Sequence, residues 1–482
     1  MVSVERKEGF NLKISRVLRE STTHRLDLYL FVPGELGLST DVIAENAFYH
    51  SAIHVKRTYY SDRHQLPLVL SRLARRGSLD SDQYRLSLSL YAYQYVAALE
   101  RGGRELHDAK REEERDEDAA AAQAAARQAR IEELVELALD ILKRLRRSRP
   151  EDARLLKYFA NVDNYLSWFT EQRLLSLVAH LPRDRHYKAN KARLLAICQA
   201  EYDYRQAQEY NSARVNRDPT RISNKMRLLR RLIEYPVTLK ETTQELGGGE
   251  EKAVKALATA VVMIFVSLGL LQARESIGDI TALFVLVLAV LYALREVFKD
   301  DLRTTLWRWL RKGRPKWRRQ YYDVHSNQLV GRQLEWFDYQ RFAKLDEAIK
   351  TARKRNVAQR EELVLHYRSS SRMSPTRFLS GYEQTRETLT LDLAVLSRLM
   401  DKASHHVYRV KDGQVVRESV EKRHLINLIT REVQGDGEPL IQRWKVVMSR
   451  SKIVDIEPAE PGQPASTATT GRDPATNAGA RE

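Results

Sequence analysis

Few residues in this sequence have the types and spacing that chemistry requires. His50 and His54 stand four apart in HSAIH, which would place two imidazoles on one helical face, but the glutamate of a zinc-protease motif is missing. His405 and His406 are adjacent and would point to opposite faces of a strand, so they cannot bind one metal together. We therefore expect neither a metal site nor a cofactor.

The other reactive groups give no catalytic motif. Cys198, the single cysteine, has no CxxC partner and lies in an apolar helical context, which predicts a small core residue. The segment GGGEEK at 247–252 lacks the spacing of a phosphate-binding loop. No G-x-S-x-G, G-x-G-x-x-G or paired-carboxylate motif with a clear context appears. The sequence predicts no catalytic residue and favours a protein that is not an enzyme.

A dense basic segment lies between Leu302 and Arg319, where eight cations stand with no acid among them and three tryptophans interleave. Cations favour an anionic leaflet, and indole rings favour the headgroup layer. Binding of single-stranded nucleic acid uses the same residue types, but this segment begins only a few residues after an apolar run. We expect it to lie flat on the inner leaflet. The predicted membrane-surface residues are Arg303, Trp307, Arg308, Trp309, Arg311, Lys312, Arg314, Lys316, Trp317, Arg318 and Arg319.

Two uncharged apolar runs precede that segment, Ala256–Ala273 and Ile280–Leu294, and a short polar island separates them. A helix rises about 1.5 Å per residue and the hydrocarbon core is about 30 Å thick, so the first run nearly spans it. The second spans it if it extends to Phe298. We predict a transmembrane hairpin with spans at about 256–273 and 280–298. A buried hairpin in a soluble core is the alternative.

Charge around the hairpin predicts its orientation. The island carries Arg274 against Glu275 and Asp279, whereas cations crowd the chain on both outer sides. We expect two membrane spans, both termini in the cytoplasm, and a bilayer with an anionic inner leaflet as the partner. The formal net charge of +17 invites nucleic acid, but much of the excess lies beside the hairpin, which makes nucleic acid less favoured.

Hydrophobic periodicity predicts an α+β multidomain membrane protein. Residues 25–32 alternate as a half-buried strand, 42–55 read as a helix, 84–91 as a strand or the start of a helix, and 327–354 as helical. Asp412-Gly413 between two short strands predicts a β-hairpin. The expected parts are an N-terminal α+β domain (1–100), a helical region with a long exposed helix (101–250), the hairpin (251–299), a basic juxtamembrane segment and helical linker (300–385), a small mainly-β domain (386–457) and a disordered tail (458–482).

Three motifs carry a resemblance. FVPGELGLS at 31–39, the hairpin followed by FKDDLR at 298–303, and WKVVMSRSKIVDIE at 444–457 resemble a group of uncharacterised bacterial inner-membrane proteins with a mid-chain two-helix transmembrane hairpin. In that group a Phe-Lys-Asp-Arg signature follows the hairpin, and Asp301 stands where the arginine would be. The resemblance implies a bacterial inner-membrane setting and no particular chemistry.

These observations favour a membrane-anchored cytoplasmic interaction, scaffold or sensing protein, with an unknown protein partner and a possible homo-oligomer. Two alternatives stay open. One is an enzyme that acts at the inner leaflet through an unrecognised site. The other, less favoured, is a nucleic-acid binder or a channel or transporter subunit.

Overall fold

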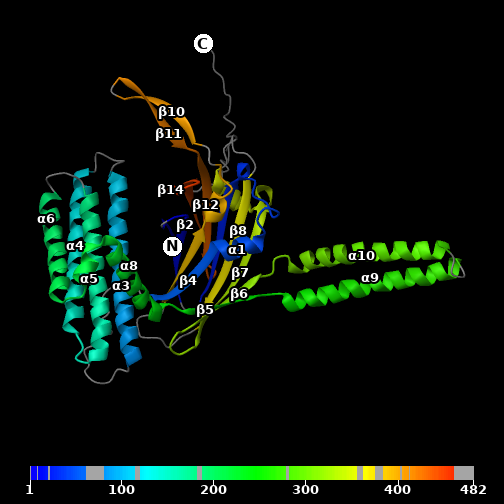
Figure 1. Ribbon diagram of the computed structural model, residues 1–482, viewed down its shortest axis with the longest axis horizontal. Helices are drawn as coiled ribbons and strands as arrows, with labels where there is room; N and C mark the ends of the chain where they lie inside the picture. The colour runs from blue at the N-terminus through cyan, green and yellow to red at the C-terminus, as the bar shows by residue number, and fades with distance from the viewer. Residues whose placement is uncertain are drawn as a thin grey trace, which may run out of the picture.

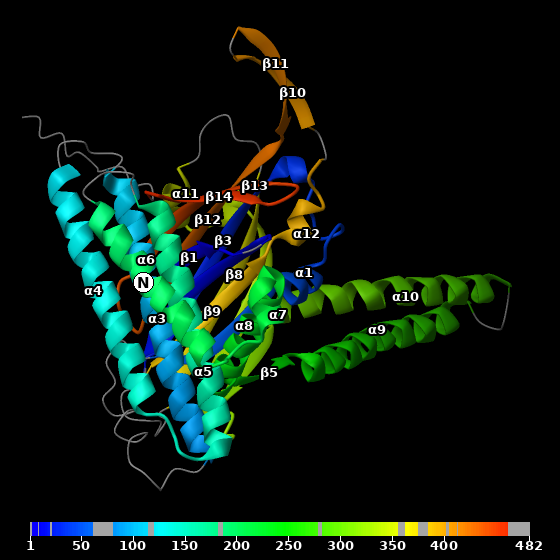
Figure 2. The same ribbon diagram turned by 60° about the vertical axis from the view of Figure 1, so that its left-hand side comes forward.

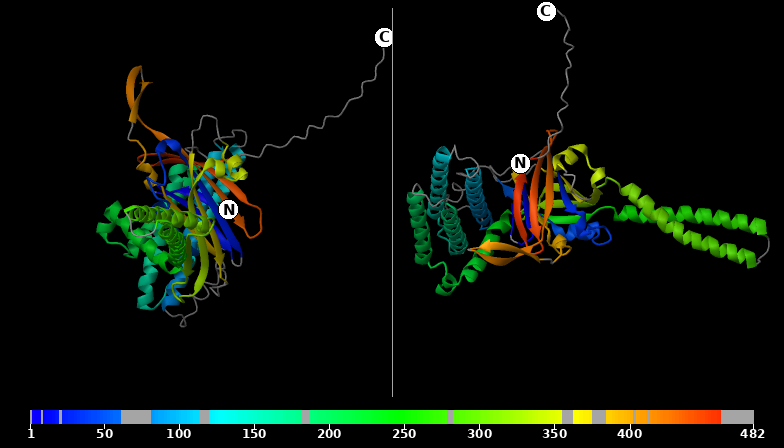
Figure 3. Two further views of the ribbon diagram at one scale, coloured as in Figure 1. Left: turned by 90° about the vertical axis from the view of Figure 1, so that its right-hand side faces the viewer. Right: turned by 90° about the horizontal axis from the view of Figure 1, so that it is seen from above.

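The chain folds into three parts arranged in a row: a helical bundle, a pair of β-sheets and a long helical hairpin (Figure 1). The bundle and the hairpin lie at opposite ends, with the sheets between them, and Figure 3 shows the same order from above. This is a computed structural model, and it describes residues 2–7, 9–19, 22–60, 81–113, 120–181, 187–277, 282–354, 362–374, 384–401, 404–411 and 413–460.

Two antiparallel sheets face each other through a shared hydrophobic core. The smaller has the order β1 (Ser3–Arg6), β2 (Asn11–Arg19), β9 (Gln384–Asp392) and β4 (Ile53–Tyr60). The larger has the order β14 (Ile453–Ala459), β13 (Leu440–Ser449), β12 (Arg423–Gln434), β3 (Thr23–Pro33), β8 (Glu362–Met373), β7 (Leu329–Arg341), β6 (Trp317–Tyr322) and β5 (Lys240–Glu245).

The two ends of the chain build these sheets together. β3 pairs with β12, and β2 and β4 both pair with β9. The N-terminal and C-terminal β regions, which we expected as separate domains over 1–100 and 386–457, therefore belong to one unit. The reason is that each region alone has too few strands to bury its apolar faces.

The bundle consists of long helices whose apolar faces join the same core as the sheets. Aspartates cap two of them: the Asp152 carboxylate accepts from the Arg154 backbone N–H, and Asp218 caps a helix that starts with Pro219. The helices are α3 (Ser81–Glu113), α4 (Ala120–Arg147), α5 (Ala153–His180), α6 (Lys188–Ala207), α7 (Ala213–Arg217) and α8 (Pro219–Glu234).

Short helices complete the body, a name used here for the two sheets and the helical bundle together. Helix α11 covers part of the outer face of the large sheet, against Tyr29, Phe31 and Ile429. The short elements are α1 (Glu45–Ala52), α11 (Glu347–Arg353), α12 (Ala394–Ser397) and the 3-10 turns η1 (Gly34–Leu36), η4 (Tyr235–Val237) and η5 (Phe342–Lys344).

The structure decides several of the secondary-structure expectations. The strand predicted at 25–32 is confirmed as β3, and the helix at 42–55 exists but ends at Ala52, where β4 begins. The segment 84–91 is helical, because Tyr84, Leu88 and Tyr91 are buried at helical spacing. Within the predicted helical region, apolar residues of α4 from Ile131 to Leu145 pack inside the bundle.

The helical linker expected within 300–385 is wrong over most of its described length. The stretch 327–354 contains strand β7, and only its end, from Glu347, is α-helical. Alternate residues of β7 face the core, but Gln333 and Glu335 occupy core-facing positions beside Phe337. These two polar side chains hide the period of two that a buried strand normally shows.

The helical hairpin is an insertion at the edge of the large sheet. Helices α9 (Gly248–Ile277) and α10 (Ala282–Arg311) lie antiparallel, side by side, and connect the neighbouring strands β5 and β6 (Figures 1 and 3). The strands pair up to Glu245 and Trp317, and the Leu246 N–H donates to the Lys316 carbonyl at 2.9 Å. The sheet hydrogen bonds therefore continue to the foot of the helices.

A second projection is the predicted β-hairpin, which is confirmed. Strands β10 (Ser404–Lys411) and β11 (Gln414–Glu421) pair antiparallel, with Lys411 opposite Gln414 and Gly413 at a φ of 76°. They form a separate two-stranded sheet, hereafter the arm, which extends away from the body (Figures 1 and 2). Of the disordered tail predicted at 458–482, Pro458 and Ala459 belong to strand β14, and residues 461–482 lie outside the described residues.

Candidate functional site

The helical hairpin exposes hydrocarbon on both helices. Within the described residues one helix, α9 over Gly248–Gln272, is long and apolar enough to cross a membrane. Only 22% of its most apolar window is buried, so this helix is not the core of a soluble domain. Helix α10 is apolar from Ala282 to Leu294 and then carries Arg295 and Glu296. The exposed large apolar residues are Leu257, Met263, Ile264, Phe265, Leu268, Leu271, Val285, Leu286, Val290, Tyr292, Leu294, Val297 and Phe298.

Ion pairs surround the foot of the hairpin, where it joins the body. Glu250 accepts from Arg314 at 3.2 Å, and Glu251 pairs with Lys255 at 2.7 Å and Arg303 at 3.5 Å. These exposed pairs link the start of α9 to the end of α10. Charge thus begins where the apolar surface ends, as it does at a bilayer boundary.

At the foot of the hairpin the backbone of Gly247 lies close to the side chains of Arg311 and Trp307. Gly247 has a φ of 99°, and a Cβ there would lie 2.1 Å from an Arg311 nitrogen and 3.2 Å from the Trp307 ring. The Arg311 guanidinium lies 5.1 Å from the Trp307 ring centroid. Only glycine fits this position without displacing the two side chains.

The predicted membrane-surface residues divide into two groups. Arg303, Trp307, Trp309, Arg311, Lys312 and Arg314 lie at the foot of the hairpin, and Trp309 is 73% exposed. Residues 302–311 form the last turns of helix α10, which ends at Arg311, rather than a segment separate from the hairpin. Membrane contact by this group stays a prediction. Of Arg308 the structure describes only the helical backbone.

The second group lies in the two facing β-sheets, hereafter the sandwich. Trp317 is 2% exposed and its ring stacks on Tyr49 with centroids 3.6 Å apart, and Arg319 is 5% exposed. Lys316 is half-buried and pairs with Glu45 and Asp338, both at 2.7 Å. For Trp317 and Arg319 the predicted membrane role is wrong, because β6 is an inner strand whose alternate residues face the core. Arg318, between them, is exposed.

A network of buried charges joins the two sheets. The Glu387 carboxylate on β9 accepts from Arg16 Nε at 2.8 Å and from Arg57 Nη2 at 2.6 Å, and all three side chains are at most 1% exposed. Hydroxyls of the large sheet complete the contacts: Ser369 and Ser371 lie 3.2 and 3.3 Å from Arg16 Nη2. Ser371 also contacts Arg57 and Glu387, so three strands of the small sheet, β2, β4 and β9, are tied to β8 of the large one.

A second charged centre lies farther along the large sheet. Arg319 Nε donates to Glu335 at 2.9 Å, and its Nη2 donates to the Tyr49 hydroxyl at 3.1 Å. The Tyr49 hydroxyl in turn donates to Glu335. Gln333, on the same strand as Glu335, extends the first centre, since its Oε1 accepts from Arg57 at 2.9 Å and from the Tyr321 hydroxyl at 2.9 Å.

The electrostatics of Glu387 follow from this geometry. Burial alone would raise its pKa, but the charges of Arg16 and Arg57 and their hydrogen bonds outweigh burial and hold the pKa at about 2. The carboxylate is therefore ionised whenever the fold is intact near neutral pH. Because the group is sealed from solvent, it binds no substrate, and its chemistry is to hold the two sheets in one register.

Sequence reasoning missed this network, although a signal was present. Arg16 interrupts the apolar alternation of NLKISRVLR at a position that should face the core. Arg57, Gln333 and Glu387 interrupt their strands in the same way. Polar residues at matching core positions of several strands are the pattern that would have indicated a buried ionic layer.

The histidine and cysteine expectations have mixed outcomes. His50 and His54 share no helical face, because α1 ends at Ala52 and His54 lies on β4. His405 and His406 are adjacent on strand β10, where His406 is exposed and only the backbone of His405 is described. Cys198 is buried in α6 as expected, and burial raises the pKa of its thiol to about 11. Among the described residues no cluster of three or more His, Cys, Asp or Glu side chains is placed to hold a metal ion.

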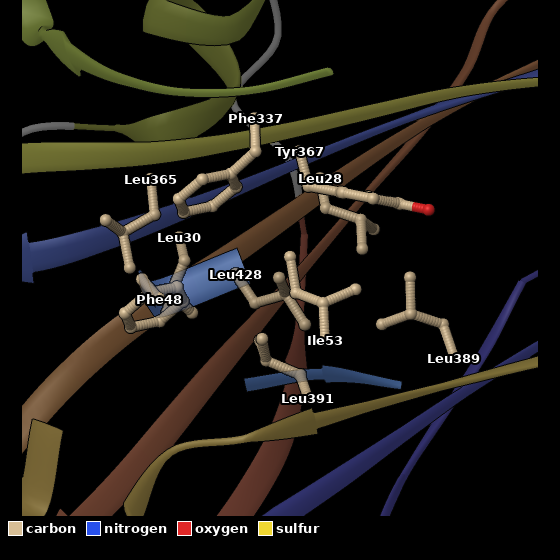
Figure 4. A pocket seen from close by; sticks show the side chains of 10 residues that line it. All are labelled: Leu28, Leu30, Phe48, Ile53, Phe337, Leu365, Tyr367, Leu389, Leu391 and Leu428. Carbon is tan, nitrogen blue, oxygen red and sulfur yellow. The ribbon is translucent and has the colours of Figure 1, made fainter. Parts of the chain in front are cut away.

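Two of the cavities in the described part of the chain differ in size and lining. One, of about 20 Å³, lies between the two sheets; the only oxygen on its labelled lining side chains is the Tyr367 hydroxyl (Figure 4). It has room for about one water molecule. The other, of about 500 Å³, is an open groove beside α4 and α6 whose lining includes Leu139, Lys143 and Arg147. Its Arg146 is held by Glu201 and Asp163.

Comparisons with protein-family models, curated proteins and solved structures gave no match to this chain. The site is therefore defined by its own geometry: an apolar hairpin with a charged foot, attached rigidly to a sandwich with a buried ionic layer.

Proposed function

We propose that this protein is a membrane-anchored interaction, scaffold or sensing protein whose hairpin inserts both helices into the inner membrane. The observation that carries the proposal is the set of outward-facing apolar side chains on α9 and α10, for example Phe265 at 70% and Leu286 at 62% exposure. In water each would remain hydrated, whereas hydrocarbon removes that cost at about 25 cal/mol per Å².

The dimensions support insertion of the pair. The uncharged part of α9, from Ala256, is long enough at about 1.5 Å per residue to cross most of a 30 Å hydrocarbon layer. Arg295 lies 5.6 Å from the Tyr292 ring centroid on α10, near the end of its apolar part, where a long side chain reaches the headgroups. Gly269 packs against Leu291, which brings the two helices close inside the layer.

The charges support a cytoplasmic body. The foot of the hairpin carries Arg303, Arg311, Lys312 and Arg314, whereas the opposite end holds Arg274 with Glu275. By the positive-inside rule the foot, the sandwich and the bundle lie in the cytoplasm. The resemblance to bacterial inner-membrane proteins agrees with this placement. The body would then present its bundle away from the bilayer, since the bundle lies at the far end from the hairpin (Figure 1).

Reporter fusions test the proposal. We expect fusions after residue 240 and at the C-terminus to report the cytoplasm and a fusion after residue 276 to report the opposite side. Carbonate extraction of the same cells should leave the full chain in the membrane pellet. A 276 fusion that reports cytoplasm in membrane-bound protein would exclude the two-span hairpin.

A further inference from the structure

The arm formed by β10 and β11 is not part of either of the two facing sheets. Its two strands pair only with each other among the described residues, and it projects from the body on a different side from the helical hairpin (Figures 1 and 2). An isolated two-stranded hairpin is marginally stable in water, and three strands or a packed face are normally needed. Pairing with a further strand would therefore stabilise the arm.

The two faces of the arm differ in character. Side chains alternate along a strand, so Arg409, Lys411 and Glu418 share one face, where Glu418 pairs with Lys411 at 3.1 Å and Arg409 at 3.8 Å. The other face carries Tyr408, Val410 and Val415 near the tip, exposed at 66, 74 and 71%. The first face also carries Val407 and Val416, each 37% exposed, so what distinguishes the second face is its more exposed apolar cluster at the tip.

The outer edge of β11 is open and carries charges that complement themselves. Arg417 forms no ion pair with a described residue, and its guanidinium contacts only the His406 ring, at 3.0 Å. Glu421, four residues on and on the same face, accepts from the Ser451 hydroxyl at 3.0 Å and has no ion-pair partner among the described residues. Two strands paired antiparallel about Ser419 would place Arg417 of each opposite Glu421 of the other.

We propose that β11 is a dimerisation edge, on which β11 of a second copy of this chain pairs antiparallel about Ser419. The contact is isologous, so it closes after two copies. It joins the arms into a four-stranded sheet and forms two Arg417–Glu421 pairs. It also brings the apolar tip of each arm beside the root of the other arm, where Leu425 is 39% exposed.

Charge complementarity favours a second copy over an unrelated partner. Arg417 and Glu421, neither of which has an ion-pair partner among the described residues, stand at the spacing that a two-fold axis requires. The contact does not depend on the membrane, although anchoring would raise the local concentration of copies. The dimer interface therefore goes beyond the proposed function. Failure of the dimer would not exclude membrane anchoring, and failure of membrane anchoring would not exclude the dimer.

Charge exchange tests the pairing on the full chain in mild detergent. Arg417→Glu and Glu421→Arg each place like charges opposite one another, and each should weaken dimerisation at least about tenfold by analytical ultracentrifugation. The double variant Arg417→Glu/Glu421→Arg restores opposite charges and should recover the wild-type dimer. A monomeric wild-type chain at high protein concentration would overturn the proposal. So would a double variant no better than the single ones.

Cross-linking gives a second readout that does not depend on affinity. In a Cys198→Ser background, Ser419→Cys lies on the two-fold axis, where facing Cα atoms of antiparallel strands are about 4.5–5.5 Å apart, within disulfide range. Arg409→Cys, on the far strand of the arm, is the matched control. We expect oxidation to give covalent dimers at 419 and few at 409. Equal yields at both positions, or none at 419, would contradict the register.

Discussion

The sandwich buries charge, whereas the hairpin exposes hydrocarbon. Inside the sandwich Arg16, Arg57 and Glu387 are sealed from solvent, and on the hairpin Phe265 and Ile264 are open to it. Each arrangement is unfavourable in isolation. The charges are stable because each has a partner of opposite sign within 3 Å, and the apolar residues become stable when lipid replaces water.

This contrast shows what each region depends on. The sandwich is stabilised by partners within the chain, so breaking a pair harms it in any solvent. In the proposed membrane setting the stability of the hairpin depends on lipid, so only a change in its compatibility with lipid would harm it. Substitutions that remove one partner or one apolar surface should therefore have separate readouts.

The largest expected effect comes from charging the hairpin. Each lysine at the centre of a span opposes insertion by about 2.5–3.5 kcal/mol, so Ile264→Lys/Phe265→Lys should oppose it by about 5–7 kcal/mol. We expect this variant to be lost from the membrane fraction that resists carbonate extraction. Leu228→Lys/Leu232→Lys on α8 is the matched control, because both leucines are exposed on the body and should leave insertion unchanged. Retention of the hairpin variant in the membrane would contradict the lipid-facing assignment.

Removing the buried carboxylate should have the next largest effect. Glu387→Gln leaves two guanidinium groups buried without a counter-charge, which we expect to lower the free energy of unfolding by about 3–5 kcal/mol. Glu418→Gln, in the ion pairs of the exposed arm, should lower it by less than about 1 kcal/mol. Urea unfolding of the detergent-solubilised chain, followed by tryptophan fluorescence, measures both. Equal losses would show that burial of the network contributes nothing.

The same carboxylate should make stability depend on acid. Its pKa in the fold is about 2, below the ordinary value of 4.5, so the stability it confers is complete above pH of about 4.5 and is lost as pH falls towards 2. We expect the midpoint of urea unfolding to fall over this range. In Glu387→Gln the fall should be shallower, because other acids still titrate but this one is gone. Parallel curves for the two proteins would exclude Glu387 as a contributor.

The smallest effect should come from truncation after Glu460. No apolar period follows Ile456, so removal of 461–482 should change neither the melting temperature nor membrane association. Differential scanning fluorimetry and fractionation of the truncated chain measure these two properties. A drop in melting temperature of several degrees would show that the tail packs on the body.

The sequence predicted the parts whose signal is local. The apolar runs of the hairpin are continuous, and Asp412-Gly413 is a turn signal between two short strands, so neither needs knowledge of distant residues. The predicted hairpin of helices and the β-arm were therefore placed correctly along the chain. Whether both helices of the hairpin cross a membrane stays a prediction.

The parts that depend on distant residues could not be predicted. Arg16 and Glu387 are 371 positions apart, and an arginine in a strand reads as solvent-exposed until its partner is known. In the same way, nothing local to Gln333 and Glu335 indicates that Arg57 and Arg319 satisfy them, so β7 was mistaken for a helix. The pairing of β3 with β12 joins the two ends of the chain, which periodicity alone cannot indicate.

The joint between hairpin and sheet has a mechanical consequence. Two connections leave the body next to each other, and the hydrogen bond between Leu246 and Lys316 bridges them just before the helices begin. A single flexible linker would let the body rotate under the membrane. Two adjacent connections joined by a backbone hydrogen bond resist both rotation and bending. In the proposed membrane setting the body would therefore keep a fixed orientation relative to the bilayer. Tilting of the helices within the lipid would rotate the sandwich and the distant bundle together.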